Sequence, residues 1–550
     1  MFQGRTILMV GLSLFMAATV HAKTEVTEFP AVPGEFIVKL KNPKLLESKS
    51  TLMAFNSTNV RIVTKESGAL VVRRPVGENR AYSMEMLANN PLVEYVEPNY
   101  IYRIVGSATD LPNDPQLNKL WGLINEGQKS NGDGGTITGL PGFDINARKA
   151  WALETGSKDV RIAVIDTGIN YNLDDIKDNI WTNEVELNGQ PGVDDDGNGC
   201  IDDIHGCDFA NNDGDPMDGH GHGSHVTGTI AASANNGKDI VGVAWHATVV
   251  GIKFLTDSGS GSLENAIKAI DYATKLGVHM TSNSWGGGGR SEALLEAIQR
   301  AEAAGILFIA AAGNSSVNMD TRPQYPAGYD VPNIISVAAV DNAGNLASFS
   351  NYGRSVHIAA PGVNILSTTP RGLQSWSGTS MACPHVSGVA ALVYSHFPNM
   401  NYSEVKDRIL ASARPTASIR GKVATGMLDA YYALSGETPP ADPNDPTGWD
   451  RTNVTFESAH PYADNFTQTF EVSVEGASKM AIHFSRFETE GNYDFLHFYD
   501  RDGNKIGSMS GTLGENVFSP VLFTDYVKVV FQTDRSNTGF GFIADSVAYQ

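Results

Sequence analysis

Residues 161–166 read RIAVID, a short apolar run that ends in an aspartate. Similar apolar runs follow at 248–255, 280–285, 306–312, 334–340 and 356–360, with helical stretches such as 263–276 and 292–304 between them. Apolar runs that alternate with helices are typical of a parallel sheet covered by helices on both faces. We therefore expect an α/β core whose functional loops lie at the carboxyl ends of its strands.

The composition limits the class of protein. A chain of 550 residues is too long for one hydrophobic core, and 41% hydrophobic residues is a normal globular content. Acidic residues outnumber basic ones by 61 to 40, which gives a net charge of -21. Such a surface repels phosphate backbones and suits a calcium-binding protein, so we expect no nucleic-acid partner. Only three cysteines are present, which excludes a disulfide scaffold.

Residues 1–22 have the pattern of a secretory signal peptide. Arg5 is the basic residue, 7–20 is the apolar stretch, and 20–22 is a cleavage site with small residues at its first and third positions. A buried N-terminal helix and an uncleaved anchor are the alternatives. No later segment reaches the roughly 18 apolar residues that a membrane span requires. We expect a secreted, extracellular protein with no membrane span.

Residues 23–105 predict a small α+β module. Strand-like runs at 34–41, 60–74 and 93–104 and a helical run at 80–90 give a β-β-α-β order, and a second helix would fit 42–55. This module lies between a signal peptide and a catalytic-looking core, which favours a propeptide. The turn-rich residues 112–115 mark the junction.

Three motifs carry candidate chemistry, and each has an ordinary structural interpretation when taken alone. Asp166 ends its strand before a Thr-Gly turn and would serve as a turn residue. His222 lies in GHGHGSHVTG at 219–228, where HxHxxH at 220, 222 and 225 leaves zinc as an alternative, although the carboxylate of HExxH is missing. Ser380 lies in GTSMACPH at 378–385 and would be a helix N-cap. We expect Pro384 within the first turn of that helix.

Together the three motifs predict nucleophilic catalysis. A serine hydroxyl is a weak nucleophile until a histidine accepts its proton, and a carboxylate fixes the tautomer of that histidine. Asp166, His222 and Ser380 supply these groups at strand ends or helix starts. Asn314, at the end of AAAGN (310–314), offers an amide that would donate to an oxyanion beside the Ser380 N–H.

The core resembles the subtilisin-like serine proteases (subtilases). The resemblance rests on DTG at 166–168, HGSHVTGT at 222–229, NSWGG at 283–287, AAAGN at 310–314 and GTSMACPHVSG at 378–388, and it covers about 110–436. It implies that Asp166 orients the base, that His222 is the base and then the acid, that Ser380 attacks the peptide, and that Asn314 stabilises the oxyanion. The Asp–His–Ser order is the known order of subtilisin.

The resemblance also implies where a substrate binds. Ser284, Trp285 and Gly286 resemble the family strand that pairs with extended substrate backbone. The alternative is an ordinary buried strand, with Trp285 in the core. Residues 324–327 would line the specificity pocket, and the preferred side chain is not predicted.

A dense carboxylate loop predicts calcium (Ca²⁺). Asp194, Asp196 and Asn198 are spaced by two, as in the first half of an EF-hand loop, and the Cys200 carbonyl and Asp203 follow. A solvated acidic loop is the alternative. The resemblance also implies that Asp175 is a calcium ligand.

The cysteines leave alternatives open. In an exported protein Cys200 and Cys207 would form a local disulfide, or they would remain two unpaired thiols. Cys383 is expected to be a small buried hydrophobic residue rather than a second nucleophile.

The last part of the chain changes in character. Residues 437–450 (ETPPADPNDPTGWD) form an acidic, proline-rich linker, and 451–550 show short strands at 480–487, 493–500 and 526–533. This module resembles a CUB-like β-sandwich through HPY at 460–462, YDF at 493–495 and TDRSNTGFGF at 532–541, but without the usual paired cysteines. The resemblance implies calcium ligands at Glu490, Asp494 and Asp534, which would otherwise cap turns. It also implies adhesion to substrate or matrix, or added stability.

The leading hypothesis is a secreted, monomeric endopeptidase that is made as a self-processing zymogen. Its partners would be protein or peptide substrates and its own propeptide, which by resemblance assists folding, inhibits the site and is cut off near 100–112. A calcium-dependent adhesin with an inactive core and an esterase with the same triad are the alternatives. The intact triad argues against the first, and the NSWGG strand against the second.

Overall fold

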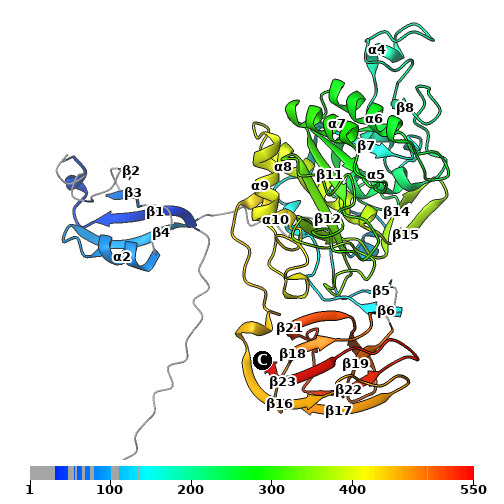
Figure 1. The fold of residues 1–550 in the computed structure, drawn as a ribbon. Helices are drawn as coiled ribbons and strands as arrows, with labels where there is room; N and C mark the ends of the chain where they lie inside the picture. Colours follow the sequence, from blue (N-terminus) through cyan, green and yellow to red (C-terminus); the bar gives the residue numbers. More distant parts are fainter. Residues whose placement is uncertain are drawn as a thin grey trace, which may run out of the picture. The chain divides into compact units, whose positions relative to one another are not determined.

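The computed structural model describes residues 31–47, 55, 59–64, 68–74, 80–100, 111–132, 135–491 and 493–550. The expected signal peptide therefore lies outside the described residues. The chain divides into two compact units, Met1–Ser107 and Ala108–Gln550 (Figure 1). Each is described below by itself.

The N-terminal unit contains an antiparallel sheet of four strands in the order β2-β3-β1-β4. Its elements are β1 (Ala31–Leu40), η1 (Pro43–Glu47), β2 (Asn59–Thr64), β3 (Ala69–Arg73), α2 (Arg80–Ala88) and β4 (Val93–Tyr100). The expected single strand at 60–74 is wrong, because the chain turns at Gly68 with φ +65° and pairs β2 with β3. Part of the expected strand at 93–104 lies beyond the described residues, as does most of the region 42–55 after η1.

The second unit is built on a parallel sheet of seven strands in the order β13-β12-β11-β10-β7-β9-β8. The strands are β7 (Gly156–Asp166), β8 (Gly206–Asp208), β9 (His246–Lys253), β10 (Met280–Asn283), β11 (Leu307–Ala311), β12 (Ile334–Val340) and β13 (Ile358–Pro361). All six expected strands are present, and only the three-residue β8 was not expected. Nearly every residue of β10 to β13 is buried, as a sheet covered on both faces requires.

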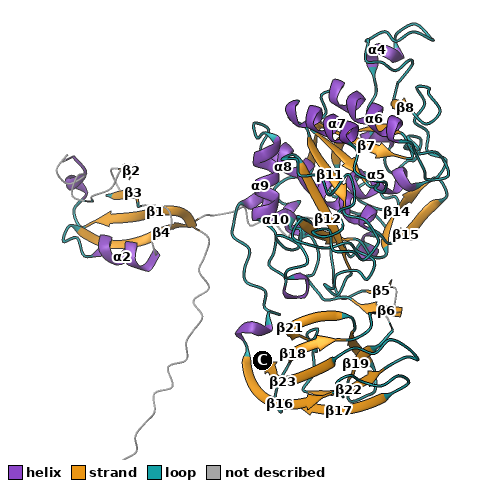
Figure 2. Cartoon of the chain, in the orientation of Figure 1, coloured by secondary structure: helices purple, strands orange, loops and turns teal. Residues whose placement is uncertain are grey.

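Helices cover both faces of this sheet (Figure 2). The main ones are α5 (His222–Ala231), α6 (Leu263–Lys275), α7 (Glu292–Ala303) and α8 (Thr379–His396). Helices α6 and α7 are amphipathic and begin at serine N-caps, Ser262 and Ser291. Helix α8 is buried along most of its length, as its apolar sequence predicts.

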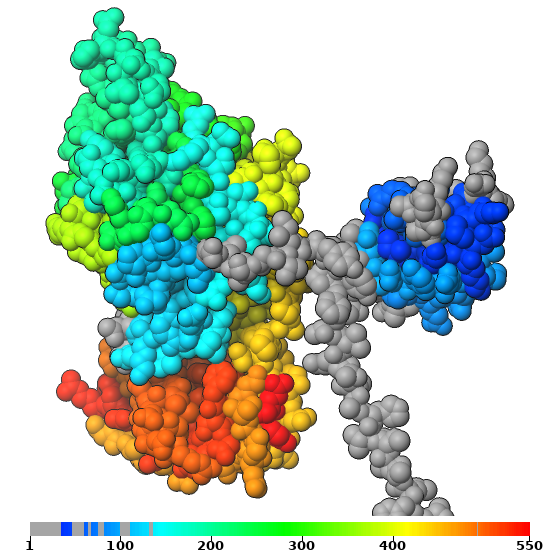
Figure 3. Space-filling view, turned by 180° about the vertical axis from the view of Figure 1, so that it is seen from behind, coloured from blue at the N-terminus to red at the C-terminus, as the bar shows by residue number. Residues whose placement is uncertain are grey.

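Shorter elements complete the unit around the sheet. They are η2 (Leu117–Lys119), α3 (Ala147–Ala150), η3 (Lys177–Asn179), α4 (Glu184–Leu187), α9 (Tyr402–Ala411), η4 (Ala417–Ile419), α10 (Ala430–Ser435) and the hairpins β5 (Lys129–Gly132)–β6 (Gly135–Thr138) and β14 (Ile365–Thr369)–β15 (Gly372–Trp376). The segment around α4 protrudes from the surrounding surface (Figure 3).

The C-terminal residues form two antiparallel sheets of four strands, β16-β23-β18-β21 and β17-β22-β19-β20. After η5 (Pro446–Gly448), the strands are β16 (Asp450–Glu457), β17 (Thr467–Ser473), β18 (Met480–Glu488), β19 (Phe495–Tyr499), β20 (Lys505–Met509), β21 (Thr512–Phe518), β22 (Tyr526–Gln532) and β23 (Gly541–Tyr549). The core between the sheets is rich in phenylalanine and separate from that of the seven-stranded sheet. Trp449, in the expected linker, packs against Ala481 and Ala548 of this sandwich.

Within the described part of the chain, the helices are too short or too polar to cross a bilayer.

Candidate active site

Asp166 and His222 meet where β7 ends and α5 begins. The Asp166 carboxylate is completely buried, and its Oδ1 lies 2.7 Å from His222 Nδ1. Oδ1 also accepts the Thr167 N–H at 2.7 Å, which fixes the carboxylate. Helix α5 packs so tightly on the turn after Asp166 that a Cβ at Gly223 would lie 2.0 Å from Gly168 O. The glycines of this motif therefore bring the imidazole onto the carboxylate.

The surroundings of His222 determine its pKa. Burial is the largest influence and lowers the pKa, but the charge and hydrogen bond of Asp166 and the charge of Asp218 raise it. The net result is a His222 pKa above the ordinary value. An imidazole held in this way is a stronger base than a free histidine, with its Nδ1 committed to Asp166.

Ser380 is the second residue of α8. Its Oγ donates to the carbonyl of Ser284 at 3.0 Å, so its hydrogen bond in this structure goes to Ser284 rather than to His222. The backbone N–H of Ser380 belongs to the first helical turn, which has no intrahelical acceptor and favours negative charge nearby.

Pro384 lies deeper in α8 than expected. It is the sixth helical residue rather than part of the first turn, so its missing N–H leaves the Ser380 carbonyl without an intrahelical donor. The hydroxyl of Ser284 donates to that carbonyl at 2.9 Å. Ser284 and Ser380 are thus joined by two hydrogen bonds, one in each direction.

Asn314 is held by its amide oxygen. Its Oδ1 accepts the N–H and the hydroxyl of Thr379, each at 2.9 Å, and Thr379 Oγ1 in turn accepts the Gly313 N–H at 3.0 Å. These bonds leave the Nδ2 group for another acceptor. Nδ2 lies 3.5 Å from the position of a Cβ on Gly378, which places the donor beside the start of α8. Asn314 Nδ2 and the Ser380 N–H are therefore two donors at the start of α8.

Ser284, Trp285 and Gly286 continue directly from the end of β10. The Trp285 ring packs against Phe254 at 4.8 Å between centroids, and it is partly buried against the core. The N–H of Gly287 donates to Tyr325 O at 3.0 Å, so the glycines lie beside the expected 324–327 segment. The Trp285 ring thus packs in the core, as the alternative of an ordinary buried strand expects. The glycines that follow it lie beside residues 324–327 instead.

His225 of the HxHxxH pattern contacts backbone carbonyls rather than a metal site. His225 Nε2 is 3.0 Å from Ile365 O and 3.2 Å from Gln374 O, and burial lowers the His225 pKa to about 3. The groups of described residues that could share a metal ion contain no member of this pattern. These contacts give no support to the zinc alternative.

Sequence reasoning missed Trp376, which lies four residues before Ser380. Its indole stacks on His225 with 4.8 Å between centroids and on His222 with 6.0 Å. Trp376 ends β15, a strand of a hairpin that the apolar pattern did not reveal. An aromatic residue just before the GTS motif was the available signal.

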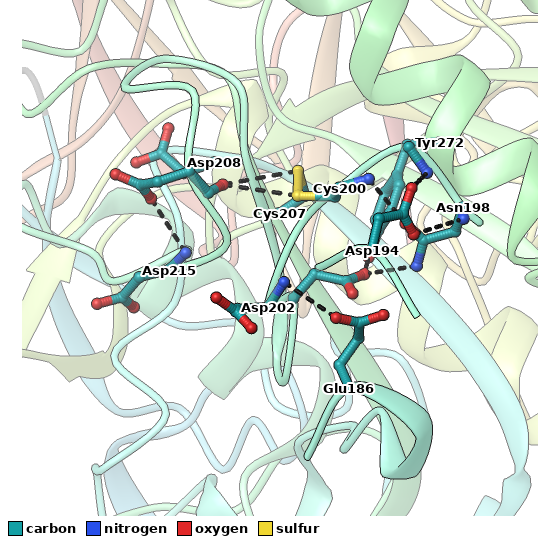
Figure 4. The surroundings of a disulfide bond; sticks show 12 residues. Glu186, Asp194, Asn198, Cys200, Asp202, Cys207, Asp208, Asp215 and Tyr272 are labelled. Atoms are coloured by element: carbon teal, nitrogen blue, oxygen red, sulfur yellow. Dashed lines mark hydrogen bonds between the residues drawn. A yellow bond between two sulfur atoms is a disulfide. The ribbon is translucent and has the colours of Figure 1, made fainter. Parts of the chain in front are cut away.

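In the carboxylate loop, the acidic oxygens that lie together are not all those expected; Glu186, Asp194 and Asn198 are labelled in Figure 4. Oxygens of Glu186, Asp196 and Asp203 lie within 4.8 Å of one another. Asn198 bridges two of them, because its Nδ2 donates to Asp196 at 3.0 Å and to Asp203 at 2.8 Å. Asp194 is not in this group; its oxygens accept the N–H groups of residues 198 and 199. Glu186, on α4, was missed because it precedes the motif by several residues.

Asp203 is the most buried member of this group, with no exposed surface. Burial raises its pKa to about 6, against the hydrogen bonds from Tyr272 and Asn198. Cys200 and Cys207 form a disulfide at the end of the loop (Figure 4), which decides between the two alternatives. Cys383 is free and buried, and burial raises its pKa to about 11, so it is no nucleophile.

Asp175 lies in a second acidic site. It is 1% exposed, and its oxygens accept from Asn236 Nδ2 at 2.8 Å and from the Ile240 N–H at 3.0 Å. Burial raises its pKa to about 6, and the charges of Asp239 and Asp114 add to this. Asp114 is also buried, and its Oδ1 has no hydrogen-bond partner. A cation beside Asp114 would satisfy this unpartnered oxygen.

Glu490, Asp494 and Asp534 come together in the C-terminal sandwich, with oxygens within 4.8 Å of one another. Asp494 is buried and accepts the Asp534 N–H at 2.8 Å and the Tyr462 hydroxyl. Glu490 Oε2 is buried without a hydrogen-bond partner. An unpartnered carboxylate oxygen in a group of acids fits a hard cation.

Three protein-family models match successive parts of the chain. The Subtilase family model matches residues 157–449, the Fervidolysin N-terminal prodomain model matches 17–99, and the CUB domain model matches 450–545. The first match spans more than half of the chain, so this chain belongs to the subtilase family of serine proteases.

Three relatives illustrate the range of the family. Thermophilic serine proteinase from Bacillus sp. (strain AK1) is 34% identical over 406 residues, which cover 74% of this chain and 88% of that protein. Subtilisin DY from Bacillus licheniformis is 37% identical over 294 residues, covering 53% and 93%. Subtilisin-like protease 1 from Plasmodium berghei (strain Anka) is 38% identical over 295 residues, covering 50% of this chain and 49% of that protein. The chain thus spans about half the length of this last relative.

Proposed function

We propose that the chain is a secreted endopeptidase that hydrolyses peptide bonds through Asp166, His222 and Ser380. The observation that carries this is the 2.7 Å contact between His222 Nδ1 and the buried Asp166 carboxylate, in a core that also holds a serine in the first turn of α8. The carboxylate holds the proton on Nδ1, so that Nε2 is the free base.

The reaction follows from these positions. His222 takes the Ser380 proton as Oγ attacks the peptide carbonyl, and the oxyanion receives Asn314 Nδ2 and the Ser380 N–H. His222 then gives its proton to the leaving amine, and the C–N bond breaks to leave an acyl-enzyme. A water molecule, deprotonated by His222, releases the acid product and restores Ser380.

The hydrogen bond between Ser380 Oγ and Ser284 O suggests how a substrate paired with residues 284–286 would activate Ser380. A peptide that pairs with residues 284–286 would donate a backbone N–H to Ser284 O, the acceptor that Ser380 Oγ uses in this structure. Loss of that acceptor would leave the hydroxyl to donate to His222. Substrate binding and activation of the nucleophile would then be linked.

The test pairs wild type with Ser380→Ala, both expressed from Met1. Wild type is expected to lose about 100 N-terminal residues and digest casein, while the variant stays full-length and inert; the expected loss of about 10⁶-fold in kcat is the value known for subtilisin itself. A variant that cleaves casein at the wild-type rate would remove Ser380 from the mechanism. If the host processes both proteins and neither cleaves casein, the alternative of an adhesin with an inactive core would be favoured.

We propose further that residues 23–105 act as an intramolecular chaperone and inhibitor after export, with cleavage near 100–112. The prodomain match over 17–99 supports this order of segments. The mature enzyme would act as a monomer on protein or peptide substrates. Refolding of the mature chain with and without the separate propeptide tests the chaperone role, because only the first mixture should regain activity quickly.

We also propose that Ca²⁺ binds at Glu186, Asp196 and Asp203, at Asp175, and at Glu490, Asp494 and Asp534. The bound ion would neutralise carboxylates that otherwise repel one another in buried or compact loops. In the first loop, Asn198 would orient two of the ligands, and Asp194 would order the turn through its bonds to backbone N–H groups.

Thermal unfolding with calcium or chelator tests these sites. Chelation is expected to lower Tm. Asp203→Asn and Glu186→Gln should each abolish most of the fall in Tm that is due to the first loop. Asp194→Asn is the matched variant. It distinguishes an EF-hand-like ligand set, which includes Asp194, from the set of Glu186, Asp196 and Asp203. If Asp194→Asn abolishes the calcium response while Glu186→Gln preserves it, the EF-hand-like set is correct.

A further inference from the structure

Lys253 is an almost completely buried lysine at the edge of the active site. It ends β9, and the parallel pairing of β7 with β9 places it opposite Asp166. Its side chain is only 2% exposed. A buried ammonium group is costly unless it is paired and hydrogen-bonded, so its partners define its role.

One partner of Lys253 is the turn that follows the catalytic carboxylate. Nζ donates to Thr167 O at 2.7 Å. The Thr167 side chain is itself tied to the other catalytic segment, because Oγ1 accepts the Gly223 N–H at 2.9 Å and donates to Asp218 at 2.9 Å. Lys253 therefore fixes the backbone of a residue that contacts both β7 and α5.

The other partner is Asp257, whose Oδ1 lies 2.7 Å from Lys253 Nζ. This carboxylate reaches the loop before His222: a Cβ on Gly219 would lie 2.3 Å from Asp257 Oδ2, and the Gly219 N–H hydrogen-bonds to the carboxylate. Contacts thus run from Thr167 through Lys253 and Asp257 to Gly219. Each end lies within three residues of a member of the Asp166–His222 pair.

We propose that Lys253 and Asp257 are positioning residues that set the geometry of the Asp166–His222 hydrogen bond. This inference rests on the proposed function. Asp257 is 64% exposed, and an ion pair with one exposed partner adds little stability. The ion pair would instead hold the turn after Asp166 and the loop before His222 in fixed relative positions. A displacement of about 1 Å in a catalytic group costs up to roughly 100-fold in rate.

The test uses Asp257→Asn and Lys253→Met, which remove the charges with little change of shape. Both are expected to lower kcat about 10- to 100-fold on a peptide substrate, with KM within about twofold of wild type. The double variant should be no slower than the slower single variant, because the two residues act as one unit. Glu264→Gln, in the exposed Lys268–Glu264 pair of the same i,i+4 spacing, is the matched control and should keep full activity.

A spectroscopic measurement separates positioning from general stability. In a Ser380→Ala background, the low-field proton resonance of His222 Nδ1–H reports the hydrogen bond to Asp166, and it should move upfield in Asp257→Asn. Should Lys253→Met fail to fold, the exposed Asp257 still provides the test. An unchanged kcat and an unmoved resonance in Asp257→Asn would overturn the inference. If wild type lacks activity, the proposed function fails, while the resonance still tests positioning.

Discussion

At the residue scale, opposing influences set the pH dependence of activity. Burial lowers the pKa of His222, but Asp166 and Asp218 raise it above the ordinary value of 6.5. A protonated imidazole cannot accept the Ser380 proton, so kcat/KM is expected to fall as the pH drops through the raised pKa. A pH–rate profile of the processed enzyme checks this, and an acid limb centred below 6.5 would contradict it.

Asp166→Asn provides a second prediction. It removes the two largest influences that raise the His222 pKa and leaves burial, so the acid limb of the residual activity should move to lower pH. We expect kcat to fall by about 10⁴-fold, because the amide no longer selects the productive tautomer. Steady-state kinetics across pH provide the check, and a limb that stays in place would show that the carboxylate does not control the imidazole.

Asn314 belongs to the same scale. Its Oδ1 is held by Thr379, so the proposed contact with the oxyanion falls to Nδ2. Asn314→Ala is expected to lower kcat about 10²–10³-fold with little change in KM, a magnitude known from subtilisin itself. A change in KM alone would mean that the amide binds the ground state.

Positions that a local sequence motif marks could be predicted, whereas positions that only the tertiary fold brings together could not. Asp166, His222 and Ser380 stand at strand or helix ends that the sequence marks. Glu186 reaches the acidic loop at 194–203 only because α4 folds back on it, and Asp194, which fits the EF-hand spacing, accepts backbone N–H groups instead.

At the element scale, helix α8 depends on a residue outside it. Pro384 deprives the Ser380 carbonyl of its helical donor, and the hydroxyl of Ser284 replaces that donor. Ser284→Ala should therefore destabilise the protein by about 1 kcal/mol, and by much less when Pro384→Ala restores an N–H. Urea unfolding of the four proteins, in a Ser380→Ala background to prevent autolysis, measures the coupling. Additive effects would show that the two groups are independent.

Strands were predictable where burial on both faces makes them continuously apolar, as in β7 and β9 to β13. The hairpin β14–β15 could not be predicted. Its exposed strand β15 lacks an apolar pattern, and the position of the hairpin depends on contacts such as that of Ser367 Oγ in β14 with His225 O. The three residues of β8 are too few to show a period. Its place at the sheet edge comes from pairing with β9.

At the scale of the whole molecule, the chain contains separate hydrophobic cores. The seven-stranded sheet and the C-terminal sandwich have cores that share no residues, and each module contains an acidic group that could hold a cation. Trp449, next to the end of the expected linker, packs on the sandwich and so belongs to it structurally. Separate cores predict separate unfolding of the two modules.

Calorimetry of the Ser380→Ala protein should therefore resolve two transitions. A ligand present at 100 times its Kd stabilises by about 2.7 kcal/mol, so loss of calcium from a sandwich of about 100 residues should lower its Tm by about 10–20 °C. Glu490→Gln is expected to lower only the sandwich transition, because Glu490 Oε2 lacks a protein partner, and Asp203→Asn only the catalytic one. The two variants control for each other. A single transition that both variants shift equally would show that the cores unfold together, and the sandwich would then stabilise the protease directly.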